Sequence, residues 1–353
     1  MRHVVLGGSA NALAICRQLD SPGTVLVDVQ ERAPAHRTRY TESVTLTSDA
    51  AEDILRTLLD LPSEQPRILY PTSDFWLEFI SQHAQTLREN GFLFFQKSCD
   101  CAEILLDKLK FFEVMNRRFQ VPHTEAAEGF AESATEIVKP RRAFIGGKLS
   151  QKGFRSNAPG LSSTHIRQQR LNSDLHNHLS ISGLFLDGSL TASICTRKVL
   201  EYPHPGGTAV MVSTIDSKEL IARLEVLAQQ ALRHLDYEGI FELEAILQEG
   251  ELWLLEINGR FWLQHAMGSN RKVNFSRAYA EALLGNVPAS STLNADKVVW
   301  IHEGMPVAFL KASRASKIDA IKTMFGKGQW IFAHFNRKDY MPFIEFIKCK
   351  LAN

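Results

Sequence analysis

The stretch from Gly239 to Arg260, GIFELEAILQEGELWLLEINGR, constrains the fold more than any other part of the sequence. Apolar and acidic residues alternate in its first run, and a run rich in Leu and Trp follows. Two such runs around Glu249-Gly250 predict a β-hairpin, because this dipeptide suits a tight turn between strands.

The spacing of polar residues in this hairpin decides which side chains can meet. Glu242 and Glu244 share one face of the first strand, because side chains alternate across a strand. Glu256 and Asn258 share one face of the second strand for the same reason. A turn with an odd number of residues, such as a three-residue loop containing Gly250, places all four on the same face. A turn with an even number separates the two pairs.

Three carboxylates and an amide on one face repel each other unless a positive charge lies among them. Oxygen atoms of this kind are the ligands that hard cations prefer, Mg²⁺ above all when phosphates complete the shell. Arg260 follows two residues after Asn258, where it can hold an anion beside the metal. The alternative interpretation is a solvated hairpin at a sheet edge.

Length and composition exclude several classes of protein. The 353 residues are enough for two or three domains. The chain has 40 Lys and Arg against 39 Asp and Glu, so we expect neither nucleic acid nor an anionic membrane as the main partner. There is no apolar run long enough to span a bilayer and no signal peptide at the start. Five cysteines do not suggest a disulfide framework, and a cytoplasmic location fits.

The start of the chain predicts an open parallel sheet. Strands at 3–6 and 24–28 flank a glycine turn at 7–9 and a helix at 10–19. The full G-x-G-x-x-G motif is absent, so a Rossmann-like domain without a dinucleotide is favoured over one that holds it. Further along, residues 102–116 have helical periodicity.

A lysine at the end of a strand marks the middle of the chain. Lys139 ends an apolar run and is followed by Pro140, which cannot continue a strand ladder, so its side chain can point into a cleft. Lysine is a common ligand of phosphate. The loop 141–148 is basic and contains glycine, and its backbone N–H groups can bind phosphate, although an ordinary hairpin turn would look the same.

Together these segments resemble the ATP-grasp superfamily, in particular its carboxylate–amine ligases with a carbamoyl-phosphate-synthetase-like ATP-grasp fold. The resemblance implies an α/β protein (α+β in the grasp domain), with a Rossmann-like pre-grasp domain before a two-lobed ATP-grasp domain. It rests on Asp107-Lys108, Val138-Lys139-Pro140, Gln168-Gln169, Arg197, Pro203–Gly207, Gly239–Glu244 and Leu255–Trp262. The implied domains are a pre-grasp domain at 1–103, a small lobe and hinge at 104–185, a large lobe with the metal site at 186–290, and a C-terminal extension at 291–353 packed on the core.

The resemblance also implies site residues and cofactors, namely ATP and Mg²⁺, with Mn²⁺ as a substitute. The metal ligands would be Glu244, Glu256 and Asn258, with Glu242 as the alternative first ligand. Arg197 and Arg260 would hold the γ-phosphate or the acyl phosphate. The family more often has Glu where Gln169 stands, but an amide can also bind a ribose hydroxyl. The residues implied to contact ATP are Lys108, Lys139, Lys148, Gln168 and Gln169.

The implied activity is an ATP-dependent ligase that joins a carboxylate to an amine, such as an amino acid or peptide, through an acyl phosphate. Two alternatives stay open: an enzyme that uses bicarbonate, such as a carboxylase or a carbamoyl-phosphate-type member, and a nucleotide-binding protein without catalysis. His204 and His265 lie near motif loops and are candidate acid–base groups. A homodimer is the default expectation for such an enzyme.

Overall fold

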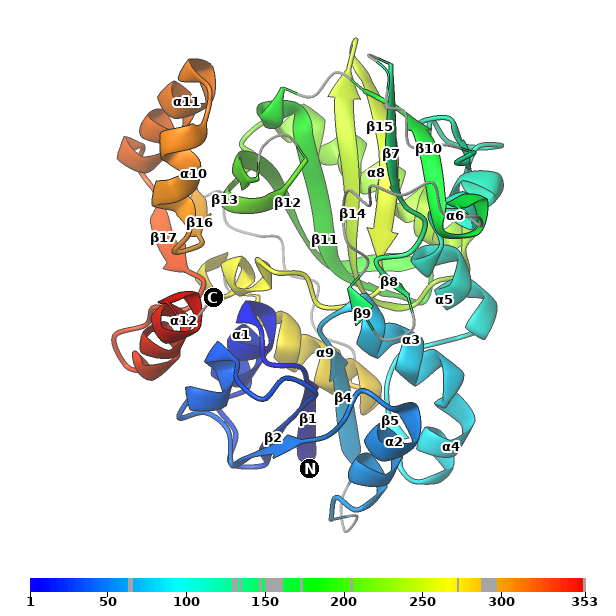
Figure 1. The fold of residues 1–353 in the computed structure, drawn as a ribbon, viewed down its shortest axis with the longest axis vertical. Helices are drawn as coiled ribbons and strands as arrows, with labels where there is room; N and C mark the ends of the chain where they lie inside the picture. Colours follow the sequence, from blue (N-terminus) through cyan, green and yellow to red (C-terminus); the bar gives the residue numbers. More distant parts are fainter. Residues whose placement is uncertain are drawn as a thin grey trace.

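The computed structural model describes residues 1–62, 66–128, 133, 135–145, 148–149, 161–171, 174–203, 206–271, 273–286 and 297–351. In this part of the chain a five-stranded parallel sheet lies at one end of the molecule and a seven-stranded sheet at the other (Figure 1). A three-stranded sheet and a two-stranded hairpin lie beside the larger sheet. The predicted α/β class is therefore confirmed.

The amino-terminal sheet has the strand order β3-β2-β1-β4-β5, and all its neighbours pair in parallel. β1, β2 and β4 are almost fully buried, which explains why each reads as a short apolar run. Its strands are β1 Arg2–Leu6, β2 Thr24–Asp28, β3 Ser43–Leu46, β4 Arg67–Pro71 and β5 Phe92–Leu93. Its helices are α1 Ala10–Leu19, η1 Pro34–Arg37, α2 Ala51–Leu59, α3 Asp74–Gln82 and α4 Ala84–Glu89.

The glycine turn after β1 is covered by protein. A Cβ atom at Gly8 would collide with the side chains of Asp28, Ala33 and His36. The backbone N–H of Ala35 also donates to the Gly8 carbonyl, which holds η1 over the turn. The space beside the second glycine is therefore filled by protein side chains.

The small sheet has β10 between β6 and β7, both antiparallel to it. The helical periodicity predicted at 102–116 is confirmed, but it is divided between two helices, α5 and α6, which are separated at Asp107. The Asp107 carboxylate accepts the backbone N–H groups of Leu109 and Lys110 at 3.1 and 3.2 Å, so it starts a new helix instead of continuing the first. The elements here are α5 Cys99–Leu106, α6 Lys108–Met115, β6 Thr124–Ala126, β7 Glu136–Pro140, β8 Phe144–Ile145, β9 Lys148–Leu149, α7 Leu161–Thr164 and β10 His165–Gln169.

The large sheet has the order β15-β14-β11-β12-β13-β16-β17. Its last two strands come from the predicted C-terminal extension, which therefore adds to the sheet as well as packing on it. The strands are β11 His178–Leu186, β12 Ser189–Tyr202, β13 Thr208–Thr214, β14 Gly239–Gln248, β15 Glu251–Asn258, β16 Val298–Ile301 and β17 Gln329–Phe332. The helical segments around them are η2 Leu175–Asn177, α8 Lys218–His234, η3 His265–Arg271, α9 Phe275–Leu283, α10 Met305–Lys311, α11 Arg314–Phe325 and α12 Met341–Leu351.

Helix α8 covers one face of the large sheet. Its buried residues, among them Leu224 and Leu232, pack in one cluster with Phe241 and Leu243 of β14. Phe241 and Leu243 alternate with Glu242, so the carboxylates of β14 point to the opposite face. None of the helices among the described residues combines the length and the apolar composition that a membrane crossing requires.

Candidate functional site

The β14–β15 hairpin places four oxygen-bearing side chains on one face of the large sheet. Glu242 is directly opposite Asn258, and Glu244 is directly opposite Glu256. Asn258 also donates from Nδ2 to Glu242 Oε2 at 3.3 Å. Glu242 and Asn258 are each 8% exposed, whereas Glu244 and Glu256 are only partly buried and more accessible from solvent.

A β-bulge, and not an odd turn, produces this arrangement. The turn has two residues, Glu249 and Gly250, both with positive φ (54° and 83°), and Gln248 pairs with Glu251 across it. A two-residue turn alone would separate the two pairs of polar side chains. The register shifts between Glu244 and Ala245, where Leu255 is the extra residue of β15. This one-residue shift brings all four polar groups to the same face.

Each carboxylate on this face has its own cation partner. Lys108 Nζ is 3.7 Å from Glu256 Oε2, and Lys198 Nζ is 3.4 Å from Glu244 Oε2. Arg260 contacts Glu242 Oε2 at 3.7 Å and Asp74 Oδ1, in α3, at 3.2 Å. The site thus combines residues from α3, α6, β12, β14 and β15, which are far apart in the sequence.

The electrostatics of the carboxylates differ sharply. Burial, and next the neighbouring charge of Glu244, raise the pKa of Glu242 to about 8. Burial alone would also raise the pKa of Glu256, but Lys108 and Lys139 outweigh it and lower that pKa to about 2. A hard divalent cation such as Mg²⁺ would offset the repulsion between oxygen side chains that lie this close together.

The small sheet brings Lys139 toward the same carboxylates. Lys139 pairs with Ile166 of β10, and Gln168 lies two residues further on the same face. Gln168 is 6% exposed and donates from Nε2 to Thr124 Oγ1 at 2.9 Å. Gln169 points to the opposite face, where its Oε1 accepts the backbone N–H of His123 at 3.2 Å. The two neighbouring glutamines therefore cannot both direct their side chains at one nucleotide.

Arg197 lies away from this site, contrary to the prediction. Its guanidinium pairs with Asp319 of α11 at 3.4 Å. Ser180 of β11 pairs with Thr196 of β12 on one side and with Glu244 of β14 on the other. Thr196 therefore lies on the face of the sheet that carries the carboxylates, and so does the residue two positions further along β12. That residue is Lys198, and its distance from Glu244 confirms the placement. The sequence contains both cations side by side, but only the register shows which of them faces the carboxylates.

Several other predicted residues lie elsewhere or outside the description. Lys148 begins β9, but its side chain, Gly146-Gly147 of the glycine loop and His204 are outside the described residues. His265 has no exposed surface, and its Nδ1 bonds the Trp262 carbonyl at 2.9 Å. A histidine enclosed in this way cannot exchange protons with a substrate in the cleft.

A second polar cluster, formed by His302, Glu303 and His334, has ligand atoms within 4.8 Å of one another. Both carboxylate oxygens and one ring nitrogen of each histidine already have partners within the protein. Glu303 Oε1 accepts the backbone N–H groups of His334 and Phe335, and Oε2 lies 2.7 Å from His334 Nδ1. His302 Nδ1 accepts the backbone N–H of Gly304. We therefore interpret this cluster as a link between the segments that follow β16 and β17.

Comparison with known proteins relates the middle of the chain to a family of domains. Residues 105–262, which include the hairpin and the four cations of the site, match the family model of an ATP-grasp domain. This segment of the chain is similar to ATP-grasp domains. The predicted resemblance is thereby confirmed, and no curated protein matches the chain in sequence.

Solved structures of two synthetases and a carboxylase subunit have the same fold over most of this chain. An N5-carboxyaminoimidazole ribonucleotide synthetase in complex with ADP is 13% identical, with a TM-score of 0.63 over 84% of this chain and 80% of its own. The phosphoribosylglycinamide synthetase of Anaerococcus prevotii is 11% identical, with a TM-score of 0.59 over 81% and 76%. The biotin carboxylase subunit of a pyruvate carboxylase is 13% identical, with a TM-score of 0.57 over 84% and 74%. At these sequence identities the similarity shows the fold only, and the reaction has to be inferred from the residues of the site.

Proposed function

We propose that this ATP-grasp protein is a carboxylate–amine ligase. A substrate carboxylate attacks the γ-phosphorus of ATP, the bond to the bridging oxygen breaks, and an acyl phosphate and ADP form. An amine then attacks the acyl carbon, phosphate leaves, and the amine loses a proton, which gives an amide. Phosphoryl transfer needs positioning and charge stabilisation more than covalent help from the protein.

The observation that carries this proposal is the convergence of charges on one sheet face of an ATP-grasp domain. Three carboxylates and an amide lie among four cations from four separate segments. Lys108 comes from the start of α6, Lys139 from β7, Lys198 from β12 and Arg260 from the end of the hairpin. A solvated hairpin would have no physical reason to gather these cations over its polar face.

Glu244, Glu256 and Asn258 would hold Mg²⁺, which when bound neutralises charge on the ATP phosphates. Glu244 is favoured over Glu242 as the first ligand, because Glu242 is more buried and already accepts from Asn258 and contacts Arg260. Mn²⁺ suits the same oxygen ligands. The site has the donor set that such an ion requires.

The cations have separate proposed tasks. Lys108 and Lys139 would bind the phosphates of ATP, with Lys148 of the β8–β9 hairpin and Gln168 of β10 completing the nucleotide site. Lys198 would take the role that the sequence assigned to Arg197. Together with Arg260 it would stabilise the charge that develops on the transferring phosphoryl group and the acyl phosphate. The pKa of Lys198 is raised, chiefly by Glu244, so it stays protonated at neutral pH.

A second candidate is phosphorylation of bicarbonate. One solved structure with the same fold is a biotin carboxylase domain bound to bicarbonate, 14% identical with a TM-score of 0.58. The two candidates share the ATP chemistry and differ only in the acid, so Lys198 and Arg260 would serve either of them.

The test is phosphate release from the purified protein with MgATP, across pools of carboxylates and amines, with and without added bicarbonate. Release that requires one carboxylate and one amine would support the ligase and identify its substrates. Release that requires bicarbonate instead would favour the second candidate. If the wild type and Lys198→Met both bind ATP but neither releases phosphate under any of these conditions, the two candidate functions are contradicted.

A further inference from the structure

The near-zero net charge of the chain conceals an uneven distribution. Residues 305–351, which the structure describes throughout, contain nine Lys and Arg but only three Asp and Glu. Since the whole chain has 40 basic and 39 acidic residues, the remainder has 31 and 36. The carboxyl-terminal segment is thus strongly basic, and the rest of the protein is acidic.

Each of the three acids of this segment is paired with an arginine from an earlier part of the chain. Asp319 pairs with Arg197 of β12 at 3.4 Å, and Asp339 pairs with Arg17 of α1 at 2.8 Å. Glu345 accepts from Nε of Arg32, in the loop before η1, at 2.9 Å. None of the acids in residues 305–351 is exposed, whereas eight of the basic side chains are. These are Lys311, Arg314, Lys322, Lys327, Arg337, Lys338, Lys348 and Lys350.

The same segment exposes large apolar side chains. Phe325 is 85% exposed and Leu310 75%. Eleven of the sixteen exposed large apolar side chains in the described part of the chain lie here. They are Val307, Leu310, Ile318, Ile321, Phe325, Trp330, Phe332, Phe335, Tyr340, Ile347 and Leu351. We call the exposed side chains of residues 305–351 the C-terminal surface.

Figure 1 shows where this surface lies. Helices α11 and α10, strand β17 and helix α12 form a column along one side of the molecule, drawn in orange and red. β17 is the outer strand of the large sheet, with Trp330 and Phe332 exposed. The surface is therefore carried by elements that follow one another along a single side of the molecule.

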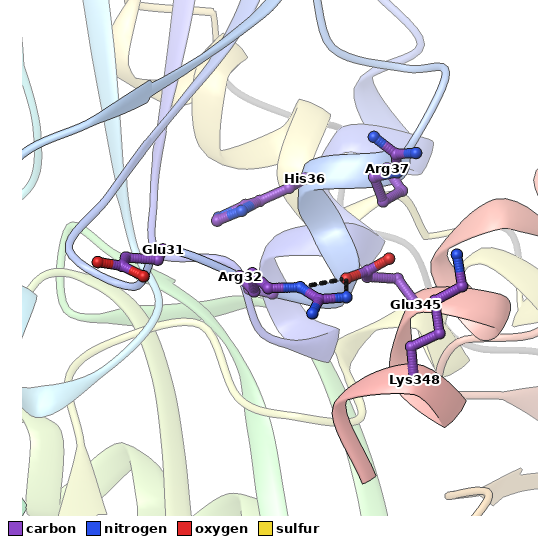
Figure 2. A pocket seen from close by; sticks show the side chains of 7 residues that line it. Glu31, Arg32, His36, Arg37, Glu345 and Lys348 are labelled. Atoms are coloured by element: carbon purple, nitrogen blue, oxygen red, sulfur yellow. Dashed lines mark hydrogen bonds and ion pairs between the residues drawn. The ribbon is translucent and has the colours of Figure 1, made fainter. Parts of the chain in front are cut away.

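A cavity of about 320 Å³ lies at the α12 end of this column, and Figure 2 shows the side chains around it. Arg32 and Arg37 enter from the segment around η1, and Lys348 and Glu345 from α12. Arg32 neutralises Glu345 through both its Nε and one terminal nitrogen. The remaining charged groups of the lining are two exposed cations, Arg37 and Lys348, and one exposed carboxylate, Glu31, so the balance of charge favours an anion from solvent.

We propose that the C-terminal surface binds the anionic surface of a lipid membrane. Exposed aromatic and aliphatic side chains among Lys and Arg are typical of proteins that lie at a membrane interface. The cations would contact lipid phosphates, and side chains such as Phe325 and Trp330 would enter the boundary between head groups and acyl chains. The cavity beside α12 would receive one such phosphate. This is attachment to one leaflet and agrees with the lack of a membrane-crossing helix among the described residues.

The charge and the apolar side chains of the C-terminal surface favour an anionic membrane over two other partners, a second copy of the chain and a nucleic acid. A second copy of the chain would bring two basic surfaces together, with no exposed acid in residues 305–351 of either copy to offset them. A nucleic acid would match the cations, but it gives no reason for exposed aliphatic residues such as Leu310 and Ile321. An anionic membrane matches both the charge and the apolar side chains.

The proposal is tested by co-sedimentation of the full chain with vesicles. Phosphatidylcholine vesicles are compared with vesicles that also contain phosphatidylglycerol, at low and high salt. We expect binding that requires the anionic lipid and weakens with salt. Lys322→Gln with Lys327→Gln should weaken binding about 25-fold, because each Lys or Arg at an anionic surface contributes about 1 kcal/mol, or about fivefold. Phe325→Ser should weaken it about tenfold.

Matched controls lie on other parts of the protein. Arg117→Gln with Arg118→Gln removes two exposed cations near the end of α6, and Val226→Ser removes a 57% exposed apolar side chain from α8. Both should bind vesicles like the wild type, and all four variants should bind ATP normally. Absence of binding to anionic vesicles at low salt would overturn the proposal, as would equal losses in the controls. Equal affinity for duplex DNA, or a dimer that Phe325→Ser dissociates, would assign the surface to another partner.

Discussion

Replacing Lys198 and, separately, its neighbour Arg197 by Met tests the most specific statement that the site geometry makes. Both residues lie on β12, both are cations and both are part-buried, but they point to opposite faces of the sheet. Lys198 Nζ lies 3.4 Å from Glu244 Oε2, with side-chain exposures of 20% and 22%. Arg197 lies 3.4 Å from Asp319 of α11, at 29% and 30%. The pair is therefore matched in charge, distance and exposure.

The expected magnitude follows from the distance. A phosphate oxygen as far from Lys198 Nζ as Glu244 Oε2 is, at 3.4 Å, would interact with it by about 5 kcal/mol at an effective dielectric constant of about 20. Partial exposure to water and the remaining cations Lys139 and Arg260 reduce what one lysine contributes to a transferring phosphoryl group. We expect a loss of about 3–4 kcal/mol, which is 10²–10³-fold in kcat, for Lys198→Met. Arg197→Met should change kcat by no more than about twofold.

The assay is steady-state phosphate release with MgATP and the substrates found in the pooled screen. Thermal denaturation of both variants shows whether the fold is retained, and ATP binding shows whether the nucleotide site is intact. Equal losses of kcat in the two variants would refute the assignment of the reaction to the sheet face that carries Lys198 and not to the face that carries Arg197. Full activity in Lys198→Met would remove this lysine from the reaction altogether.

Three further predictions concern other parts of the protein. Glu256→Gln should abolish Mg²⁺-dependent phosphate release, whereas Glu251→Gln, exposed on the same strand, should leave it unchanged; comparable activity in both would contradict the metal assignment. Lys139→Ala should weaken ATP binding about tenfold or more in calorimetry with little change in melting temperature, and unaltered affinity would place this lysine outside the site. Burial lowers the pKa of His265 to about 4 from 6.5, so the folded state binds its proton less readily than the unfolded state. The contribution of neutral, buried His265 to the free energy of unfolding is complete above pH 6.5, and about 3 kcal/mol of stability is lost as the pH falls toward 4. His265→Gln should flatten the decrease in unfolding free energy over this pH range. An unchanged slope in the variant would disprove this role of His265.

The sequence predicted the parts of this site that depend on local pattern. Alternation over Glu242, Glu244, Glu256 and Asn258 predicted two polar pairs, each on one face of a strand, and the structure has them. Whether the pairs share a face depends on one unpaired residue, Leu255. A bulge at that position leaves no compositional signal, because Leu255 differs in no evident way from the apolar residues beside it.

The remaining differences have the same origin in tertiary contacts. The faces of Arg197 and Lys198 follow from pairing with β11, which the sequence of β12 does not encode by itself. The helix predicted at 102–116 is divided at Asp107, whose carboxylate also binds Arg141 of the small sheet at 2.7 Å. Sequence periodicity predicts that a segment is helical, but it does not predict the long-range contact that ends the helix.

The parallel-sheet domain has a structural part in the site although its glycine turn is filled. Asn11 of α1 donates from Nδ2 to the carbonyls of Thr72 and Phe261, at 2.6 and 3.0 Å, and the Phe261 N–H donates to the Pro71 carbonyl. These bonds fix the chain next to Arg260, whose guanidinium is held 3.2 Å from Asp74 of α3. The end of the hairpin is therefore positioned by the region of the amino-terminal parallel sheet. A carboxylate on that domain, Asp74, keeps Arg260 beside Glu242, so the direction of the arginine depends on contacts between domains and not on the hairpin alone.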